Sequence, residues 1–227
     1  MKAVILDEIP FAVDREQLRR RLRVRPGSAE TSELDGLIEA ALALGQPRAL
    51  YGVAYIERRT DTEVTIDGVT FASRALVVNL AAVHRVFPCL ATCGVELGQW
   101  ADGLDDVLHQ FWAEEIKLAA LACAVDAQRA ALARDFSPGN TSAMNPGSLD
   151  DWPLGQQRPL FALLREADAV GVTLNESCLM TPNKSVSGLR FATESTYENC
   201  MLCPRADCPG RRALYDATLW DRHYRLA

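Results

Sequence analysis

Three cysteines with the spacing of metal ligands lie near the end of this 227-residue chain. They are Cys200, Cys203 and Cys208, in the order Cys-x2-Cys-x4-Cys, and a proline follows each of the last two. A two-residue spacer lets both thiolates of a pair reach one metal ion or cluster from a single turn. A four-thiolate site needs one more ligand, and Cys178, in a loop just upstream, is the best candidate.

Three interpretations of this cysteine set stay open. The first is an iron–sulfur cluster, most simply a 4Fe–4S cluster with four thiolates. The second is a structural zinc site with the same ligands, because tetrahedral four-thiolate sites stabilise small loops. The third is thiols that hold no metal or that are redox-active. The other three cysteines, Cys89, Cys93 and Cys123, are expected to be buried free thiols.

The composition is typical of a soluble globular protein. Apolar residues make up 48% of the chain and charged residues 24%, which allows a sizeable core without disulfides. The net charge of −6 argues against a general nucleic-acid binder. No apolar stretch is long enough to predict a membrane span, and Asp7 and Glu8 interrupt any signal-peptide core. We therefore expect a cytoplasmic protein with reduced cysteines and no nucleic-acid or membrane partner.

Hydrophobic periodicity predicts strands and helices in the first half of the chain. A strand is expected over residues 3–6 and an amphipathic helix over residues 32–44. Short β-type runs then follow, at residues 51–57, 63–66, 69–72 and 75–80. The Asp67-Gly68 pair between two of these runs is typical of a type I′ hairpin turn. This stretch is predicted to be an antiparallel meander.

Helices dominate the prediction for the second half. A long alanine-rich helix is expected over residues 104–134, and another over residues 159–170. The buried face of the long helix is expected to be set by four apolar residues, Leu104, Val107, Leu108 and Phe111. A loop rich in Ser, Asn, Pro and Gly separates the two helices, and a loop of that length is typical of a binding segment or of disorder.

Three segments of this half resemble one known family. They are Pro-Gly at 146–147, Leu-Asn-Glu-Ser at 174–177 and Pro-Asn-Lys-Ser-Val-Ser-Gly at 182–188. Their order and ungapped spacing resemble the Pro-Gly-Tyr loop, the Leu-Thr-Glu-Ser strand and the Pro-x-x-Ser-Val-Ser-Gly turn of the reactivation (activation) domain of cobalamin-dependent methionine synthase. The resemblance implies an α+β fold, a curved domain with a twisted antiparallel sheet flanked by helices.

The resemblance also implies ligands. In the family this domain binds S-adenosylmethionine beside the corrinoid and supports reductive methylation, in which cob(II)alamin takes up one electron and is trapped by a methyl group. The candidate ligand-binding residues are Gly147, Glu176, Ser185, Ser187 and Gly188. The family carries an arginine and a tyrosine where this chain has Ala143 and Ser148. An arginine can clamp a carboxylate bidentately and alanine cannot, so adenosylmethionine binding in the family's manner is not expected.

The expected organisation has two parts. Residues 1–195 are predicted to form the domain similar to the methionine synthase activation domain, and residues 196–227 a cysteine-rich metal-binding segment packed on it. The predicted function is accessory: reductive reactivation of a corrinoid-dependent methyltransferase, from cob(II)alamin to cob(I)alamin or methylcobalamin, through the cysteine-ligated cluster. The predicted partners are the corrinoid protein or cobalamin-dependent methyltransferase, which brings the cobalamin, and an electron donor protein.

Two alternative functions stay open. One is an adenosylmethionine-dependent reactivase of methionine synthase, and the other is a zinc-stabilised module that binds the corrinoid protein. No catalytic residue is predicted, because no Ser-His-Asp or Cys-His arrangement can be defended from the sequence. Whether the chain is itself an enzyme, such as a corrinoid reductase, is left open.

Overall fold

An antiparallel sheet of eight strands forms the body of the chain, in a computed structural model that describes residues 2–194, 197–208 and 210–225. The strand order is β1-β2-β6-β3-β4-β5, and β10 pairs with β6 and β7. The strands are β1 (Ala3–Leu6), β2 (Arg48–Gly52), β3 (Ala54–Arg59), β4 (Glu63–Ile66), β5 (Val69–Ala72), β6 (Arg85–Thr92), β7 (Thr141–Met144) and β10 (Ser185–Ala192). A two-stranded ribbon joins β8 (Thr173–Leu174) and β9 (Met180–Thr181).

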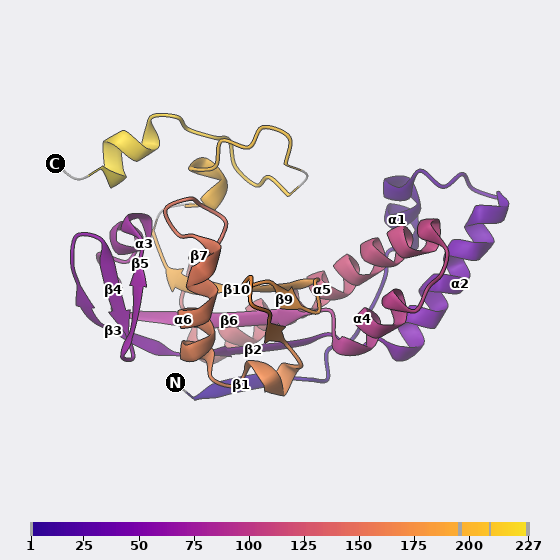
Figure 1. Cartoon of the computed structure of the whole chain (residues 1–227), viewed down its shortest axis with the longest axis horizontal. Coiled ribbons are helices and arrows are strands. Elements are labelled where there is room, and N and C mark those ends of the chain that lie inside the picture. Colours follow the sequence, from indigo (N-terminus) through magenta and orange to yellow (C-terminus); the bar gives the residue numbers. More distant parts are fainter. Residues whose placement is uncertain (1, 195–196, 209, 226–227) are drawn as a thin grey trace.

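Helices cover both faces of the sheet. They are α1 (Arg15–Leu22), α2 (Ala29–Leu44), α3 (Arg74–Asn79), α4 (Val95–Asp102), α5 (Val107–Phe136) and α6 (Gln157–Leu164). Along β2, Leu50 packs with Leu160 of α6, and the next residue, Tyr51, packs with Leu132 of α5. Successive strand residues point to opposite faces, so α6 and α5 lie on opposite sides of the sheet (Figure 1). The predicted fold class is confirmed.

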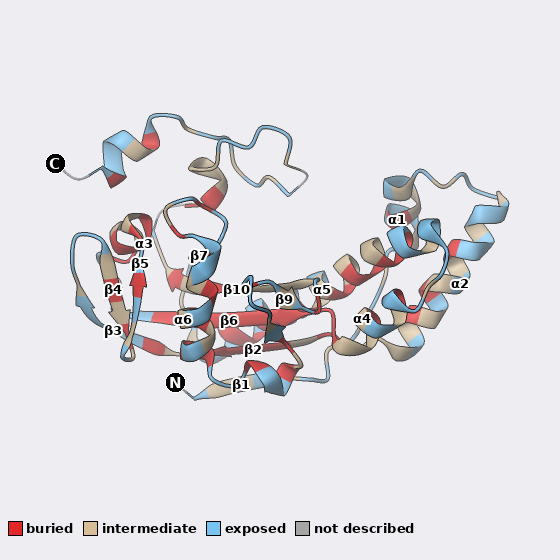
Figure 2. Cartoon of the chain, viewed as in Figure 1, coloured by how far each residue is buried: buried red, intermediate tan, exposed pale blue. Residues whose placement is uncertain are grey.

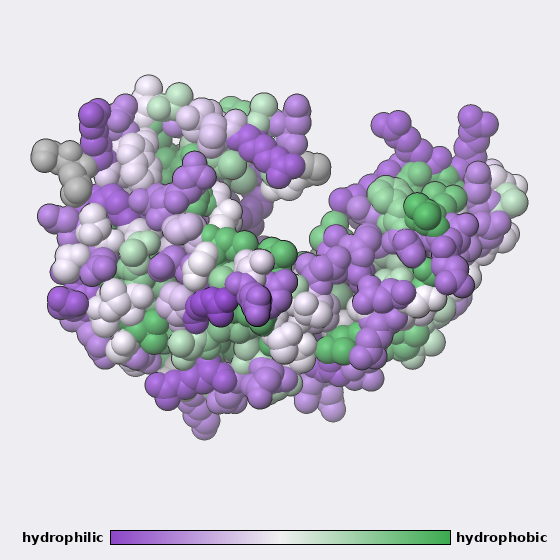
Figure 3. All heavy atoms as spheres, viewed as in Figure 1, coloured by the Kyte–Doolittle hydropathy of each residue, from purple (hydrophilic) through white to green (hydrophobic). Residues whose placement is uncertain are grey.

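A helical arm extends from one end of the sheet. It consists of α1, α2, α4 and the first half of α5 (Figure 1). Its own apolar cluster includes Leu34, Ile38, Leu97, Trp112 and Ile116, and Figure 2 shows buried positions continuing from the sheet along α5 into the arm. The molecule is therefore curved, and the space-filling view is hollowed between the arm and the C-terminal segment (Figure 3). Among the described residues, no helix has the length and apolar character needed to cross a membrane.

The C-terminal segment, residues 197–225, returns to the end of the body that carries α3 (Figure 1). Tyr197 and Tyr224 belong to the same buried cluster as the sheet. The hydroxyl of Tyr224 donates to the Oδ1 of Asn79 at 3.0 Å, and its carbonyl accepts from the Nε of Arg74 at 3.0 Å. The segment is thus anchored near both of its ends. The predicted boundary at 195/196 lies outside the described residues, and the division into two parts stays a prediction.

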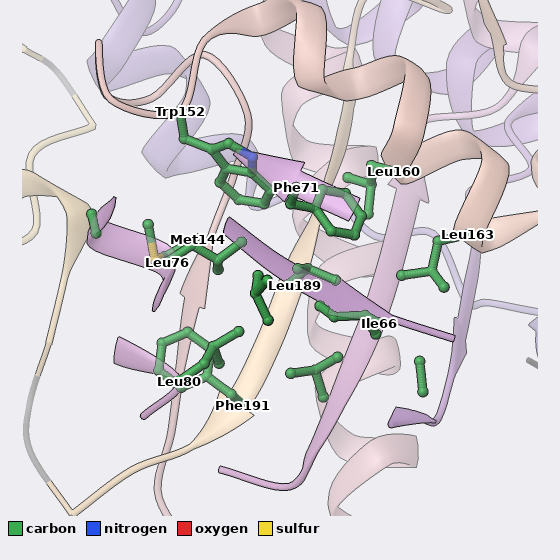
Figure 4. Close-up of a cluster of buried hydrophobic side chains, with 14 of the residues drawn as sticks. Ile66, Phe71, Leu76, Leu80, Met144, Trp152, Leu160, Leu163, Leu189 and Phe191 are labelled. Atoms are coloured by element: carbon green, nitrogen blue, oxygen red, sulfur yellow. The ribbon is translucent and has the colours of Figure 1, made fainter. Parts of the chain in front are cut away.

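The body's core fixes the loop between β7 and α6. Trp152, in that loop, is fully buried and meets Phe71 of β5 edge to face, with ring centroids 6.1 Å apart (Figure 4). Leu160 and Leu189 pack in the same cluster. Because an aromatic side chain of this size anchors its main chain firmly, the neighbouring Pro-Gly pair is held close to the sheet.

The run at residues 75–80 is a helix, α3, and the predicted strand there is wrong. The side chain of Ser73 caps the helix. The carboxylate of Asp151 also accepts the main-chain N–H groups of Arg74 and Ala75, at 3.2 and 2.9 Å. A helix begins with unsatisfied N–H groups, so these two acceptors outweigh the β preference of the valines that follow.

The predicted buried face of α5 is also wrong at its start. Val107, Leu108 and Phe111 are 78%, 45% and 56% exposed, and Leu104 precedes the helix, whose N-cap is Asp106. The stripe that packs with α2 and α4 begins only at Trp112. None of the four predicted residues belongs to the buried stripe, because the apolar spacing at the start of the helix could not show where the covering helices α2 and α4 lie.

The single strand predicted over residues 51–57 is instead divided between β2 and β3, which both pair with β6. The hairpin turn and two of the helices are confirmed, the helices with shifted bounds. The hairpin turn is type I′, with φ of 44° at Asp67 and 80° at Gly68. The helix predicted at 32–44 starts at Ala29, and the one predicted at 159–170 is α6 followed by the 3₁₀ turn Ala167–Val170.

Two segments predicted as loop or turn are strands. Residues 141–144 form β7, and the Ser-Val-Ser-Gly run at 185–188 opens β10. The two strands pair in register, with Met144 opposite Leu189. These strands form because they pair with each other, and a local pattern in a Ser- and Gly-rich run does not predict such pairing.

Candidate functional site

A cavity of about 1110 Å³ lies between the C-terminal segment and the loop after β7. Cys200, Cys203 and Cys208 line it from the segment, and Asn145 and Gly147 line it from the loop. Three of the four predicted metal ligands and one predicted ligand-binding glycine therefore line the same cavity.

The loop side of the cavity is rigidly held. The N–H of Gly147 donates to the carbonyl of Trp152 at 2.7 Å, so the buried tryptophan fixes the turn. Gly147 has φ of +83°, and a Cβ there would lie 3.0 Å from the Cδ1 of Leu154. The Nδ2 of Asn145 donates to the carbonyl of Ser187 at 2.7 Å, which ties the loop to β10. Glycine is required here by its conformation and by close packing.

On the segment side, Cys200 lies in the one-turn 3₁₀ helix Asn199–Met201. Its Sγ accepts the main-chain N–H of Arg212 at 3.4 Å. Burial raises the pKa of this thiol, but the N–H groups of Arg212 and Ala213 and the guanidinium groups of Arg212 and Arg211 together bring the pKa below its usual value. The surroundings therefore favour the thiolate, the form that binds metal.

The donor set fits a soft metal or cluster, although the thiols do not yet meet at one point. Within the described ranges, no group of three or more His, Cys, Asp or Glu side chains is placed to hold a metal ion. Thiolates are the ligands that zinc and iron–sulfur clusters favour, and hydrogen bonds to ligand atoms tune such a site. Metal binding would need the three cysteines on the segment side to come closer together.

Cys178 lies apart from this wall. It occupies the connection between β8 and β9, is 7% exposed and has φ of +62°. It is not among the described residues that line the cavity. Its role as the fourth ligand stays a prediction, and fulfilling it would require this connection to move.

The remaining cysteines divide by burial. Cys89 and Cys93 are buried and free, as predicted, and burial raises their pKa to about 12 and about 11. Cys123 is partly exposed rather than buried, and its Sγ lies 3.6 Å from the carbonyl of Ala12. Its apolar surroundings in the sequence did not reveal that this side of α5 is only partly covered.

The two predicted serines are bound within the protein. The hydroxyl of Ser187, 2% exposed, donates to the Oε1 of Gln157 at 2.6 Å. The Oγ of Ser185 lies 2.8 Å from both the Oγ1 of Thr92 and the carbonyl of Pro182. Neither lines the cavity among its described residues, and these contacts support a role in holding β10 in place.

Gly188 and Glu176 also lie off the cavity wall. A Cβ at Gly188 would lie 2.4 Å from the carbonyl oxygen of Met144, so glycine permits the close approach of β10 and β7. Glu176 is exposed, and its main-chain carbonyl accepts from a guanidinium N–H of Arg158 at 2.7 Å. The ligand-binding roles predicted for both residues stay untested.

Arg211 and Arg212 were not predicted from the sequence. Both contact the cysteine loop, Arg211 through its guanidinium and Arg212 through its main-chain N–H. Their position, three and four residues after Cys208, was the available signal. Ligands of a metal site are recognisable by type, whereas residues that contact the main chain around it are not.

Two comparisons relate this chain to known proteins. The family model for the activation domain of vitamin B12-dependent methionine synthase matches residues 149–207, a range that includes Cys200 and Cys203. A crystal structure of the MetH reactivation domain bound to AdoHcy matches with a TM-score of 0.60 and 14% sequence identity, over 87% of this chain and 81% of that chain. No curated protein sequence matches significantly. The resemblance predicted from the sequence is confirmed, and the structural likeness shows the fold.

Proposed function

We propose that this chain is an accessory protein for the reductive reactivation of a cobalamin-dependent methyltransferase of the methionine synthase type. The family-model match and the fold shared with the MetH reactivation domain support this role. The observation that carries the finer proposal is the cavity in which three cysteines face the Gly147 loop.

The residues at the cavity have different proposed roles. Cys200, Cys203 and Cys208 would hold a metal group, with Cys178 as the predicted fourth ligand. The main-chain N–H of Arg212 stabilises negative charge on the first of these sulfurs. An iron–sulfur cluster, when bound there, would supply single electrons at low potential, which is what cob(II)alamin of a partner protein needs to become cob(I)alamin. The electron itself would come from a separate donor protein.

Metal analysis of protein purified without air tests the first half of this proposal. We expect iron and acid-labile sulfide together, and a broad visible absorption band. The triple variant Cys200→Ser/Cys203→Ser/Cys208→Ser should lose both, whereas Cys123→Ser, outside the cavity, should keep them. Zinc in place of iron would support the zinc-stabilised binding module instead, and a protein that takes up no metal after anaerobic reconstitution would contradict both.

Electron transfer tests the second half. The loaded protein is reduced, freed of reductant and mixed with a corrinoid protein in the cob(II)alamin state. Loss of the cob(II)alamin absorption, with one electron delivered per cobalt, is the expected result. A loaded and reduced protein that leaves cob(II)alamin unchanged would exclude direct reduction as its function.

An adenosylmethionine-dependent reactivase is a second candidate, and the register between strands β10 and β7 supports it. Arg190 of β10 pairs directly with Ala143 of β7, so a guanidinium lies on the strand next to the position where the family has its arginine. The similar solved domain is bound to AdoHcy. Calorimetry with adenosylmethionine decides: heat that disappears in Arg190→Leu would favour this candidate, and no heat with the wild-type protein would exclude it.

A further inference from the structure

The guanidinium of Arg211 is surrounded by main-chain carbonyls of the cysteine loop. Its Nη1 donates to the carbonyls of Cys200 and Ala213, each at 3.1 Å. Its Nη2 donates to the carbonyl of Cys203 at 3.2 Å and to that of Arg205. One side chain thus joins four points of a loop that has little regular structure.

These contacts use the charge of Arg211 on the main chain rather than on an acidic side chain. Among the residues that the structure describes, no carboxylate forms an ion pair with it. A guanidinium has five N–H donors in a fixed plane and stays charged at every physiological pH, so it can satisfy several carbonyls at once. Lysine has neither the planar fork nor the reach to replace it.

The neighbouring arginine has a different task. The guanidinium of Arg212 forms an ion pair with Glu198 at 3.0 Å, while its main-chain N–H points to the sulfur of Cys200. The conformation at Arg211 therefore fixes both the carbonyls of Cys200 and Cys203 and the N–H that the sulfur of Cys200 accepts.

We propose that Arg211 is a positioning residue for the thiolate metal site, and that the motif of this segment is Cys-x2-Cys-x4-Cys-x2-Arg. This rests on the proposed function only in that the cysteines bind a metal. The guanidinium holds the turn from Cys200 to Arg205 in a shape from which the thiolates can close on a metal, and its positive charge lies beside the negative charge that they bring. Residues of this kind, one step removed from the metal, commonly change its affinity by about 10–100-fold.

The experiment measures how quickly a chelator removes metal from the full-length protein. Wild type, Arg211→Lys and Arg211→Gln are loaded with the same metal, and release is followed by absorbance. We expect release on the order of tenfold faster in Arg211→Gln, and an intermediate rate in Arg211→Lys. Arg222→Gln is the matched control, because Arg222 lies in the same segment but its guanidinium pairs with Asp216; its release rate should equal that of wild type.

Thermal unfolding of the metal-free proteins separates positioning from folding. We expect Arg211→Lys to unfold within a few degrees of wild type, because Tyr197 and Tyr224 anchor the segment independently. Release rates equal to wild type in both Arg211 variants would overturn the inference, and so would a metal-free Arg211→Lys protein that no longer folds. If wild type itself binds no metal, the proposed function fails before Arg211 is tested.

Discussion

The Nζ of Lys117 lies 3.0 Å from the Oδ1 of Asn183, although the lysine side chain is only 2% exposed. Asn183 belongs to the turn that opens the family-like Pro-x-x-Ser-Val-Ser-Gly run, and Lys117 lies in the middle of α5. Glu114, one turn earlier, accepts from Lys117, from the Nδ2 of Asn183 at 3.0 Å and from the Nζ of Lys184 at 2.9 Å. The arm helix and the sheet are thus joined by one compact charged network.

Lys117→Met is expected to destabilise the protein by about 1–3 kcal/mol. The substitution keeps the aliphatic volume but leaves the carbonyl oxygen of the Asn183 amide without its donor and removes one cation from Glu114. The loss is smaller than for a fully buried pair, because Glu114 is 35% exposed and retains Lys184. Urea unfolding measures it. Lys184→Met, which removes a cation that is 28% exposed, should cost less than about 1 kcal/mol.

The same network predicts a pH dependence. Burial raises the pKa of Glu114, but the hydrogen bonds from Lys117 and Lys184 lower it by more. The pKa of Glu114 in the folded protein therefore lies below its usual value. A depressed carboxyl pKa contributes stability above the unfolded pKa, and that stability is lost as pH falls through the folded pKa. The stability difference between wild type and Lys117→Met should therefore shrink as the pH is lowered below the ordinary range of a glutamate. A difference that stays constant down to acid pH would contradict this network.

Gly188→Ala is expected to destabilise by about 1–3 kcal/mol, because the new Cβ would meet the main-chain oxygen of Met144 and force β10 and β7 apart. The change should also disturb Asn145, whose side chain lies 2.5 Å from the same position, and therefore the loop side of the cavity. Denaturant unfolding measures the loss in the free energy of unfolding, and faster hydrogen exchange in residues 141–147 would locate the disturbance. Gly36→Ala is the control: the site is open and helical, so the alanine should stabilise slightly.

What could be predicted from the sequence was mostly local. The Asp67-Gly68 hairpin was correct because two adjacent residues with positive φ specify the turn by themselves. The helix at residues 74–79 was missed because one of its caps, Asp151, comes from a distant loop. Apolar spacing predicted α5 but not its buried stripe, which starts at Trp112, because the helices that cover it come from other parts of the chain.

The candidate site divides in the same way. Cys200, Cys203 and Cys208 were singled out because Cys-x2-Cys-x4-Cys is a spacing typical of metal ligands, and the structure places all three on one cavity. Arg211 was missed because its partners are carbonyls, and every residue has one. Cys178 lies in a separate connection, between β8 and β9, and its position in the sequence could not show that it lies off the cavity wall.

The thiolate-favouring surroundings of Cys200 predict its reactivity in the metal-free protein. Its pKa lies below the usual value, so its reaction with iodoacetamide should begin at a lower pH than that of an ordinary thiol. Cys89 and Cys93 should stay unmodified until the protein unfolds, because burial raises their pKa to about 12 and about 11. Peptide mapping by mass spectrometry across a pH series identifies each site. A Cys200 that reacts no earlier than free cysteine would contradict the role of the Arg212 and Ala213 amides.

Cys178→Ser tests the one predicted ligand that the structure places off the cavity wall. A serine hydroxyl does not ionise in the range where a thiol does, so it is a poor substitute for a soft ligand. If Cys178 closes the site, this variant should lose metal to a chelator as readily as Cys208→Ser, whereas Cys89→Ser, an equally buried thiol elsewhere, should behave as wild type. Metal should then also protect residues 175–179 from hydrogen exchange, because that connection must move to reach the other three cysteines. Unchanged retention of metal in Cys178→Ser would leave the cavity with three cysteine ligands and require a fourth from its own wall or from a bound molecule.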